Sequence, residues 1–188
     1  MKVLNLLLLS VSLAMDAFSV SLCKGLKLKQ NLIKNAMIVA AFFGVAQALM
    51  PLLGWLLSRG IIVYVQKFGP YIAFGILAVI GVKMIIDAVR GEEDNVSDKL
   101  DIKELILLAV ATSIDALAVG VTFSIDPEQI NVFISFAVIG AVTFAICVAG
   151  VLIGHKFGDR FGKPASIIGG CVLILIGVRI MLEGMGIL

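Results

Sequence analysis

Six long runs of apolar residues, separated by short polar stretches, account for most of the sequence. Each run is long enough to cross about 30 Å of hydrocarbon as an α-helix that rises about 1.5 Å per residue. Two of the runs are interrupted near the middle by a single aspartate. The pattern predicts an all-α membrane protein with six transmembrane helices. We place these helices at Val3–Cys23, Ala36–Leu57, Tyr71–Val89, Leu105–Ile125, Val132–Ile153 and Ala165–Leu182.

The composition supports a membrane setting. Hydrophobic residues make up 61% of the 188 residues and charged residues 15%, whereas a soluble domain is about half apolar and about a quarter charged. Because most of the charges fall in short segments between the predicted helices, no basic face is left to bind nucleic acid. We therefore expect the lipid bilayer, and not nucleic acid, to be a partner of this chain.

Lysine and arginine are distributed unevenly over the two sides of the predicted bundle. Ten of the 15 fall in the first, third and fifth loops, three fall on the opposite side, and Lys83 and Arg179 lie inside predicted spans. The positive-inside rule places the more basic loops in the cytoplasm. We therefore predict a multi-pass protein with both termini outside.

The chain divides into two halves of three spans each, residues 1–90 and 105–188, joined by a charged segment at 91–104. The sequence SLAMDAFSVS around Asp16 recurs in related form as ATSIDALAVG around Asp115. Since each half has an odd number of spans, the second must enter the membrane in the opposite direction. The sequence thus predicts two inverted three-helix repeats, joined by a cytoplasmic linker and forming one transport domain with a site near the midplane.

Asp16 and Asp115 are the strongest candidates for that site. A carboxylate at bilayer depth costs at least about 2.5–3.5 kcal/mol even on insertion scales, and no basic residue is expected at the same depth to offset the charge. If the helices that carry them face each other, the two carboxylates approach one another. The sequence leaves open whether they bind one shared ion or act as separate halves of a relay.

Other polar groups at helical spacing extend this oxygen-rich face. Gln47 is the one amide deep in the second span, and Pro51, four residues later, leaves a backbone carbonyl without its usual partner. Such oxygen ligands suit Mn²⁺, Mg²⁺ or Ca²⁺. We take Asp16, Asp115 and Gln47 as the predicted metal ligands, with Ser12, Ser19, Thr112 and Ser113 as supporting ligands. Hydroxyls inside membranes also commonly bond their own helix or join helices together.

Two charged pairs lie within the third and sixth spans. GVK ending at Lys83 recurs as GVR ending at Arg179, and each basic residue has an acid four positions later, Asp87 and Glu183. This i,i+4 spacing predicts charge pairs, with long side chains that reach toward the membrane surface. A gating role is the second interpretation.

Two further patterns concern packing and the class of protein. Gly150, Gly154 and Gly158 have the small-xxx-small spacing that lets helices pack closely. There is no phosphate-binding loop, no Ser–His pattern and no HExxH motif, so we expect neither an enzyme nor a permanently bound cofactor. Transport by this chain must then use ion gradients.

Three segments, SLAMDAFSVSLCKG, FFGVAQALMPLLGW and ATSIDALAVG, resemble the bacterial manganese efflux pump family, MntP, within the lysine-exporter superfamily. The resemblance runs nearly end to end. It implies export of Mn²⁺, as transported substrate, across the bacterial plasma (inner) membrane. It also implies that Asp16 and Asp115 match the family's motif aspartates.

Export of a divalent cation against an inside-negative potential costs about 4.6 kcal/mol per 100 mV, because each charge costs about 2.3. We therefore expect coupling to a second ion, and paired carboxylates that can hold protons favour Mn²⁺/H⁺ antiport. Export of another divalent cation or of a small amino acid, a passive cation channel, and a structural membrane protein are the alternatives. The sequence does not predict an oligomeric state.

Overall fold

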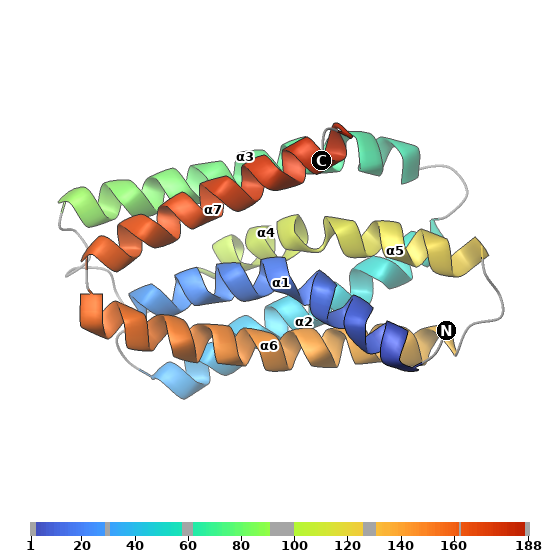
Figure 1. Ribbon diagram of the computed structural model, residues 1–188, viewed down its shortest axis with the longest axis horizontal. Helices are drawn as coiled ribbons and strands as arrows, with labels where there is room; N and C mark the ends of the chain where they lie inside the picture. Colours follow the sequence, from blue (N-terminus) through green and yellow to red (C-terminus); the bar gives the residue numbers. More distant parts are fainter. Residues whose placement is uncertain are drawn as a thin grey trace.

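The computed structural model describes residues 3–28, 31–57, 62–90, 100–125, 131–161 and 163–186, and every regular element among them is helical (Figure 1). The helices in chain order are α1 (Val3–Lys27), α2 (Leu32–Leu56), α3 (Ile62–Arg90), α4 (Ile102–Thr112), α5 (Ile114–Ile125), α6 (Val132–Phe161) and α7 (Lys163–Gly184).

The all-α prediction is confirmed, and the number of spans comes out at five to six. Five helices are long and apolar enough to cross a membrane by themselves. The fourth predicted span, Leu105–Ile125, is a pair of helices, α4 and α5, which meet at Ser113 with a bend of 45° and pass the same test only together. This break was not predicted, because no proline or glycine lies at the bend.

Most helices are longer than the predicted spans. The first continues from Cys23 to Lys27, and the fifth predicted span continues from Ile153 to Phe161. Hydropathy locates the apolar part of a helix, whereas the helix itself ends where its backbone hydrogen bonds end. The predicted linker at 91–104 lies mostly outside the described residues. Its last part includes Asp101, whose side chain accepts hydrogen bonds from backbone N–H groups at the start of α4.

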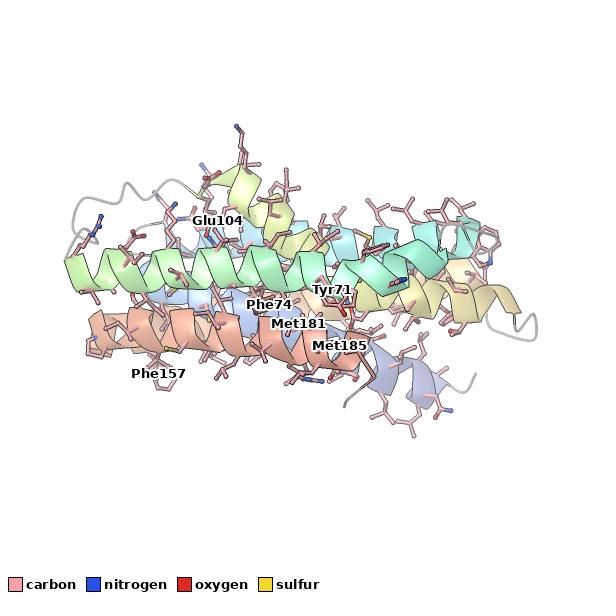
Figure 2. All side chains as sticks on the ribbon, turned by 90° about the horizontal axis from the view of Figure 1, so that it is seen from above. Tyr71, Phe74, Glu104, Phe157, Met181 and Met185 are labelled. Carbon is pink, nitrogen blue, oxygen red and sulfur yellow. The ribbon has the colours of Figure 1, made fainter. Side chains whose placement is uncertain are left out.

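The helices form two groups with α4 and α5 between them. Figure 1 shows α3 and α7 side by side along one edge of the bundle, and α1, α2 and α6 along the other. In Figure 2, Phe74 of α3 and Met181 of α7 lie in the space between those two helices. The closest long-range packing joins α1 to α6, α3 to α7, α2 to α6, and α2 to α5.

Glycines allow α6 to lie directly against α1, as their spacing predicted. Gly150, Gly154 and Gly158 face the backbone carbonyls of Phe18, Leu22 and Leu26, each one turn further along α1. A side chain at any of the three would collide with a carbonyl of α1. Backbone contact of this kind is the usual means by which membrane helices associate without a hydrophobic driving force.

We expect Gly154→Ala to destabilise the protein by about 1–3 kcal/mol, because the added methyl group would overlap the Leu22 carbonyl. Gly75→Ala is the matched control, because nothing lies within 4 Å of a methyl group there. It should be neutral or stabilising by up to about 1 kcal/mol, as alanine favours helix. Thermal unfolding in detergent measures both. Equal shifts in the two variants would contradict the proposed packing.

Candidate cation site

A cavity of about 360 Å³ brings together acidic residues from three well-separated parts of the chain. Asp16 comes from α1, Asp115 from the start of α5, and Glu183 from the end of α7. Thr112 of α4 and Pro70 of α3 also line the cavity. Two of the three predicted metal ligands thus line one cavity, as does one of the four supporting hydroxyls.

The helix break at Ser113 sets the position of Asp115. Because α5 begins at Ile114, Asp115 lies in its first turn, where the unpaired backbone N–H groups favour a negative charge. Its Oδ1 accepts a hydrogen bond from the N–H of Ala116 at 2.8 Å. The residue is exposed to solvent, and it lines the cavity. Asp16, by contrast, lies within the continuous helix α1 and is only partly exposed.

Gln47 does not line this cavity. Its fully buried amide lies between helices: Nε2 donates to the carbonyl of Leu13 at 3.0 Å, and Oε1 accepts from the Ser113 hydroxyl at 2.6 Å. Leu13 lies one turn before Asp16, and Ser113 two residues before Asp115. Gln47 therefore connects the backbone near one aspartate with the helix break beside the other.

The other predicted hydroxyl ligands mostly bond their own helix. Ser19 donates to the carbonyl of Met15 at 2.9 Å, and Thr112 to that of Leu108 at 3.0 Å. Ser12 is exposed on the outside of α1. Thr112 alone of these three also lines the cavity, so its oxygen is the one positioned to join a ligand set.

The expectation that no basic residue lies near the aspartates is wrong. Arg179 of α7 places Nη1 at 3.9 Å from Oδ1 of Asp16, while its Nε donates to Oε1 of Glu183 at 2.8 Å. That expectation compared the depths of backbone positions in the membrane. An arginine side chain, however, is long enough to reach past a full helical turn. Sequence reasoning treated Glu183 as a charge partner and missed that it lines the cavity. Its i,i+4 spacing from Arg179 was the available signal.

The charged residues of the first half are arranged differently. Asp87 Oδ2 lies 3.4 Å from Nζ of Lys27 on α1, and Lys83, its predicted i,i+4 partner, has no ion pair among the described residues. Lys24 of α1 pairs with Glu104 of α4 at 2.7 Å. All five residues line a second cavity of about 170 Å³. Figure 2 shows Glu104 toward the end of the bundle at which α3 ends.

Within the part of the chain that the structure describes, no three His, Cys, Asp or Glu side chains gather closely enough to hold a metal ion. The carboxylates of the larger cavity therefore face a shared space instead of forming a closed cage. Such an arrangement is suited to a passing ion that must also leave. It is less suited to a structural metal, whose coordination by protein ligands is closed.

Gln47→Leu should lower the free energy of unfolding by about 1–3 kcal/mol, because it leaves the buried Ser113 hydroxyl without its acceptor and removes the bond from Gln47 to the Leu13 carbonyl. Ser113→Ala removes one of the two hydrogen bonds and should cost about 1 kcal/mol. Since the residues interact directly, the double variant should cost less than the sum of the single ones. Denaturation of the purified variants in detergent measures the coupling, and strict additivity would argue against the hydrogen bond.

Known proteins are similar to this chain over nearly its whole length. Residues 30–181 match the model of a family described as "Putative manganese efflux pump". This chain belongs to that family. A relative named "Putative manganese efflux pump MntP" from Clostridium perfringens (strain SM101) is 42% identical over all of this chain and 98% of its own length. Relatives of the same name from Gloeothece citriformis and Methanocorpusculum labreanum are 43% identical (99% of this chain, 98% of theirs) and 44% identical (96% of each chain).

Membership of the MntP family and the apolar helices together identify a multi-pass membrane protein of a transporter family. The family resemblance expected from the three sequence motifs is confirmed. No solved structure matches the chain.

Proposed function

We propose that this protein is a secondary transporter that exports Mn²⁺ from the cytoplasm through a site built around Asp16 and Asp115. The observation that carries the proposal is the single cavity that both aspartates line, from helices far apart in the sequence. Its oxygen groups suit hard divalent cations, and the names of the relatives favour Mn²⁺ among them. Export of another divalent cation is the nearest alternative, because such ligands discriminate weakly between these ions.

Export of a small amino acid is less well supported. An amino acid carries a carboxylate that would need a free cationic group in the cavity. The nearest such group is Arg179, and its guanidinium is already engaged by Glu183 and lies 3.9 Å from Asp16. Three cavity-lining carboxylates favour a cationic cargo instead.

The two halves, 1–90 and 105–188, act in this proposal as inverted repeats, and reciprocal contacts support the assignment. Gly44 of α2 and Gly140 of α6 are 96 positions apart and face one another. A Cβ on Gly44 would lie 2.9 Å from the Gly140 carbonyl oxygen, and a Cβ on Gly140 would lie 2.8 Å from that of Gly44. Such mutual contact between equivalent positions is expected at a twofold axis.

A second reciprocal contact follows the same spacing. Gly54 of α2 packs on the carbonyl of Leu117, close to Asp115, and Gly150 of α6 packs on that of Phe18, close to Asp16. The glycines are again 96 positions apart and their partners 99, the offset that separates the two aspartates. This spacing supports a pairing of α1 with the α4–α5 helix and of α2 with α6, in which Asp16 and Asp115 would be equivalent positions of the two repeats.

In this proposal the molecule has the outward-facing arrangement of an alternating-access transporter. The aspartate cavity extends toward Pro70 and Gly184, at the end of the bundle where α3 begins and α7 ends. At the opposite end, the Lys24–Glu104 and Lys27–Asp87 ion pairs join α1 to α4 and to α3. The distribution of lysine and arginine assigns that closed end to the cytoplasm of a bacterial cell and both termini to the outside.

Proton antiport would supply the energy for export. In the outward-facing state, protons from outside occupy the aspartates and release Mn²⁺. In the inward-facing state, cytoplasmic Mn²⁺ displaces the protons. Two carboxylates in a confined cavity favour such exchange, because their like charges repel one another when both are ionised. Rocking of one repeat against the other would then carry the ion across.

Mn²⁺ transport by purified protein in liposomes tests this coupling. With the membrane potential clamped, an imposed pH gradient should drive Mn²⁺ movement in the direction opposite to that of the protons, and collapse of the gradient should slow it at least about tenfold. Asp16→Asn protein serves as the blank. Mn²⁺ movement that is unchanged when the pH gradient is collapsed would rule out proton antiport.

A further inference from the structure

Arg179 lies at the edge of the proposed site and contacts two of its three carboxylates. It donates to Glu183 at 2.8 Å and approaches Asp16 to 3.9 Å. Its side chain is 61% exposed, against 20% for Asp16, so the guanidinium remains in contact with water while it neighbours the cavity. No other basic side chain among the described residues forms an ion pair with a carboxylate of this cavity.

The charges of this group match a divalent cargo. When ionised, Asp16, Asp115 and Glu183 carry three negative charges, and Arg179 offsets one of them. The net charge of minus two is balanced by one divalent cation. A monovalent cation would leave one negative charge uncompensated, and it would also have to compete with a cation that is permanently attached.

We propose that Arg179 is a selectivity residue. As a tethered cation it keeps monovalent cations out of the empty site, and a divalent ion displaces it from Asp16. The proposal rests on the Mn²⁺ export function given above. A tethered group competes at a high effective concentration, so a free K⁺ or Na⁺ ion gains little by replacing it. A divalent ion attracts the same carboxylates with twice the Coulomb energy and can displace the guanidinium.

Glu183 determines where the displaced guanidinium goes. Arg179 and Glu183 are one helical turn apart on α7 and already share a hydrogen bond. When Mn²⁺ occupies the space beside Asp16, Arg179 can give up its approach to Asp16 and keep its bond to Glu183. Without Glu183, the guanidinium would remain on Asp16 and oppose binding of the cargo.

Mn²⁺ uptake by inverted membrane vesicles, measured in about 0.1 M potassium chloride or choline chloride, tests the role of Arg179. The two salts have the same ionic strength, but choline is too large to bind as K⁺ does. The wild-type KM for Mn²⁺ should be the same in both. In Arg179→Gln, KM should rise about tenfold in potassium chloride relative to choline chloride, with kcat little changed, and Arg179→Lys should restore the wild-type ratio.

Two further variants complete the test. Lys67→Gln removes an exposed positive charge from the same end of α3 without touching the cavity, and it should behave as wild type. Glu183→Gln should raise KM in both salts. A potassium effect in Arg179→Gln no larger than in wild type would overturn the proposal, as would loss of uptake in both salts. If wild-type vesicles take up no Mn²⁺ at all, the proposed export function fails instead.

Discussion

Replacing Asp16 or Asp115 with asparagine is expected to abolish Mn²⁺ export and leave the fold intact. Each carboxylate faces the same cavity and supplies charge that an amide cannot replace. The fall in kcat/KM should exceed about 100-fold for either single variant, a larger effect than is typical for a residue that only orients a ligand. In cells grown in excess Mn²⁺, both variants should fail to protect.

Stability distinguishes this loss from misfolding. Because a carboxylate at bilayer depth is costly, the asparagine variants should unfold at temperatures equal to or above that of the wild type. Ser19→Ala is the matched control on α1, since that hydroxyl bonds only the carbonyl of Met15, and it should transport normally. Full protection by the double asparagine variant would show that the protein does not need these residues for export.

The second large effect is expected at the end of the bundle that we propose faces the cytoplasm. Lys24 and Glu104 form an ion pair there at 2.7 Å, with side chains 15% and 23% exposed. Lys24→Glu places two acids together and should open this end. Cys23, which is buried and lines the cavity beneath the pair, then reports the opening. A water-soluble thiol reagent added from the cytoplasmic side should label Cys23 about tenfold faster than in wild type. Export should slow in parallel, because the outward-facing state is lost.

Charge reversal provides the decisive comparison for this ion pair. The double variant Lys24→Glu, Glu104→Lys should restore both the slow labelling of Cys23 and the rate of export. Lys34→Glu changes an exposed lysine at the same end and is the control for added negative charge. It should change neither the labelling rate of Cys23 nor the rate of export. The exposed Cys171 is replaced with serine throughout. Fast labelling that persists in the double variant would mean that the ion pair does not close this end.

Much of the fold could be predicted from the sequence, because hydropathy and charge act over whole helices. The apolar runs located the described helices, with α4 and α5 taken as one span, and the glycines at 150, 154 and 158 predicted close helix packing without naming α1 as the partner. The break at Ser113 could not be predicted. The Ser113 hydroxyl at the break donates to Gln47, which lies 66 residues away in the sequence, and such a long-range contact is not visible in the local sequence.

The candidate site could be predicted in part: Asp16, Asp115 and Thr112 line the cavity and were all among the candidate residues, whereas Glu183 was not expected there. Asp16 and Asp115 were evident because a lone charge in an apolar run is conspicuous, whatever the packing. Gln47 was taken for a ligand, but its amide is occupied between α1 and the helix break. Arg179 and Glu183 reach the site because their side chains are long and because α7 lies close to α1. The position of a residue along its own helix predicts neither feature.

The central claim is that Asp16 and Asp115 together hold one exported ion, and Mn²⁺ binding to purified protein tests it most directly. Equilibrium dialysis, with electron paramagnetic resonance to count free Mn²⁺, should give one bound ion per chain in the wild type. Either single asparagine variant should bind none at the same concentration. One ion retained by each single variant, or two ions per wild-type chain, would contradict a shared site and show that the aspartates act separately.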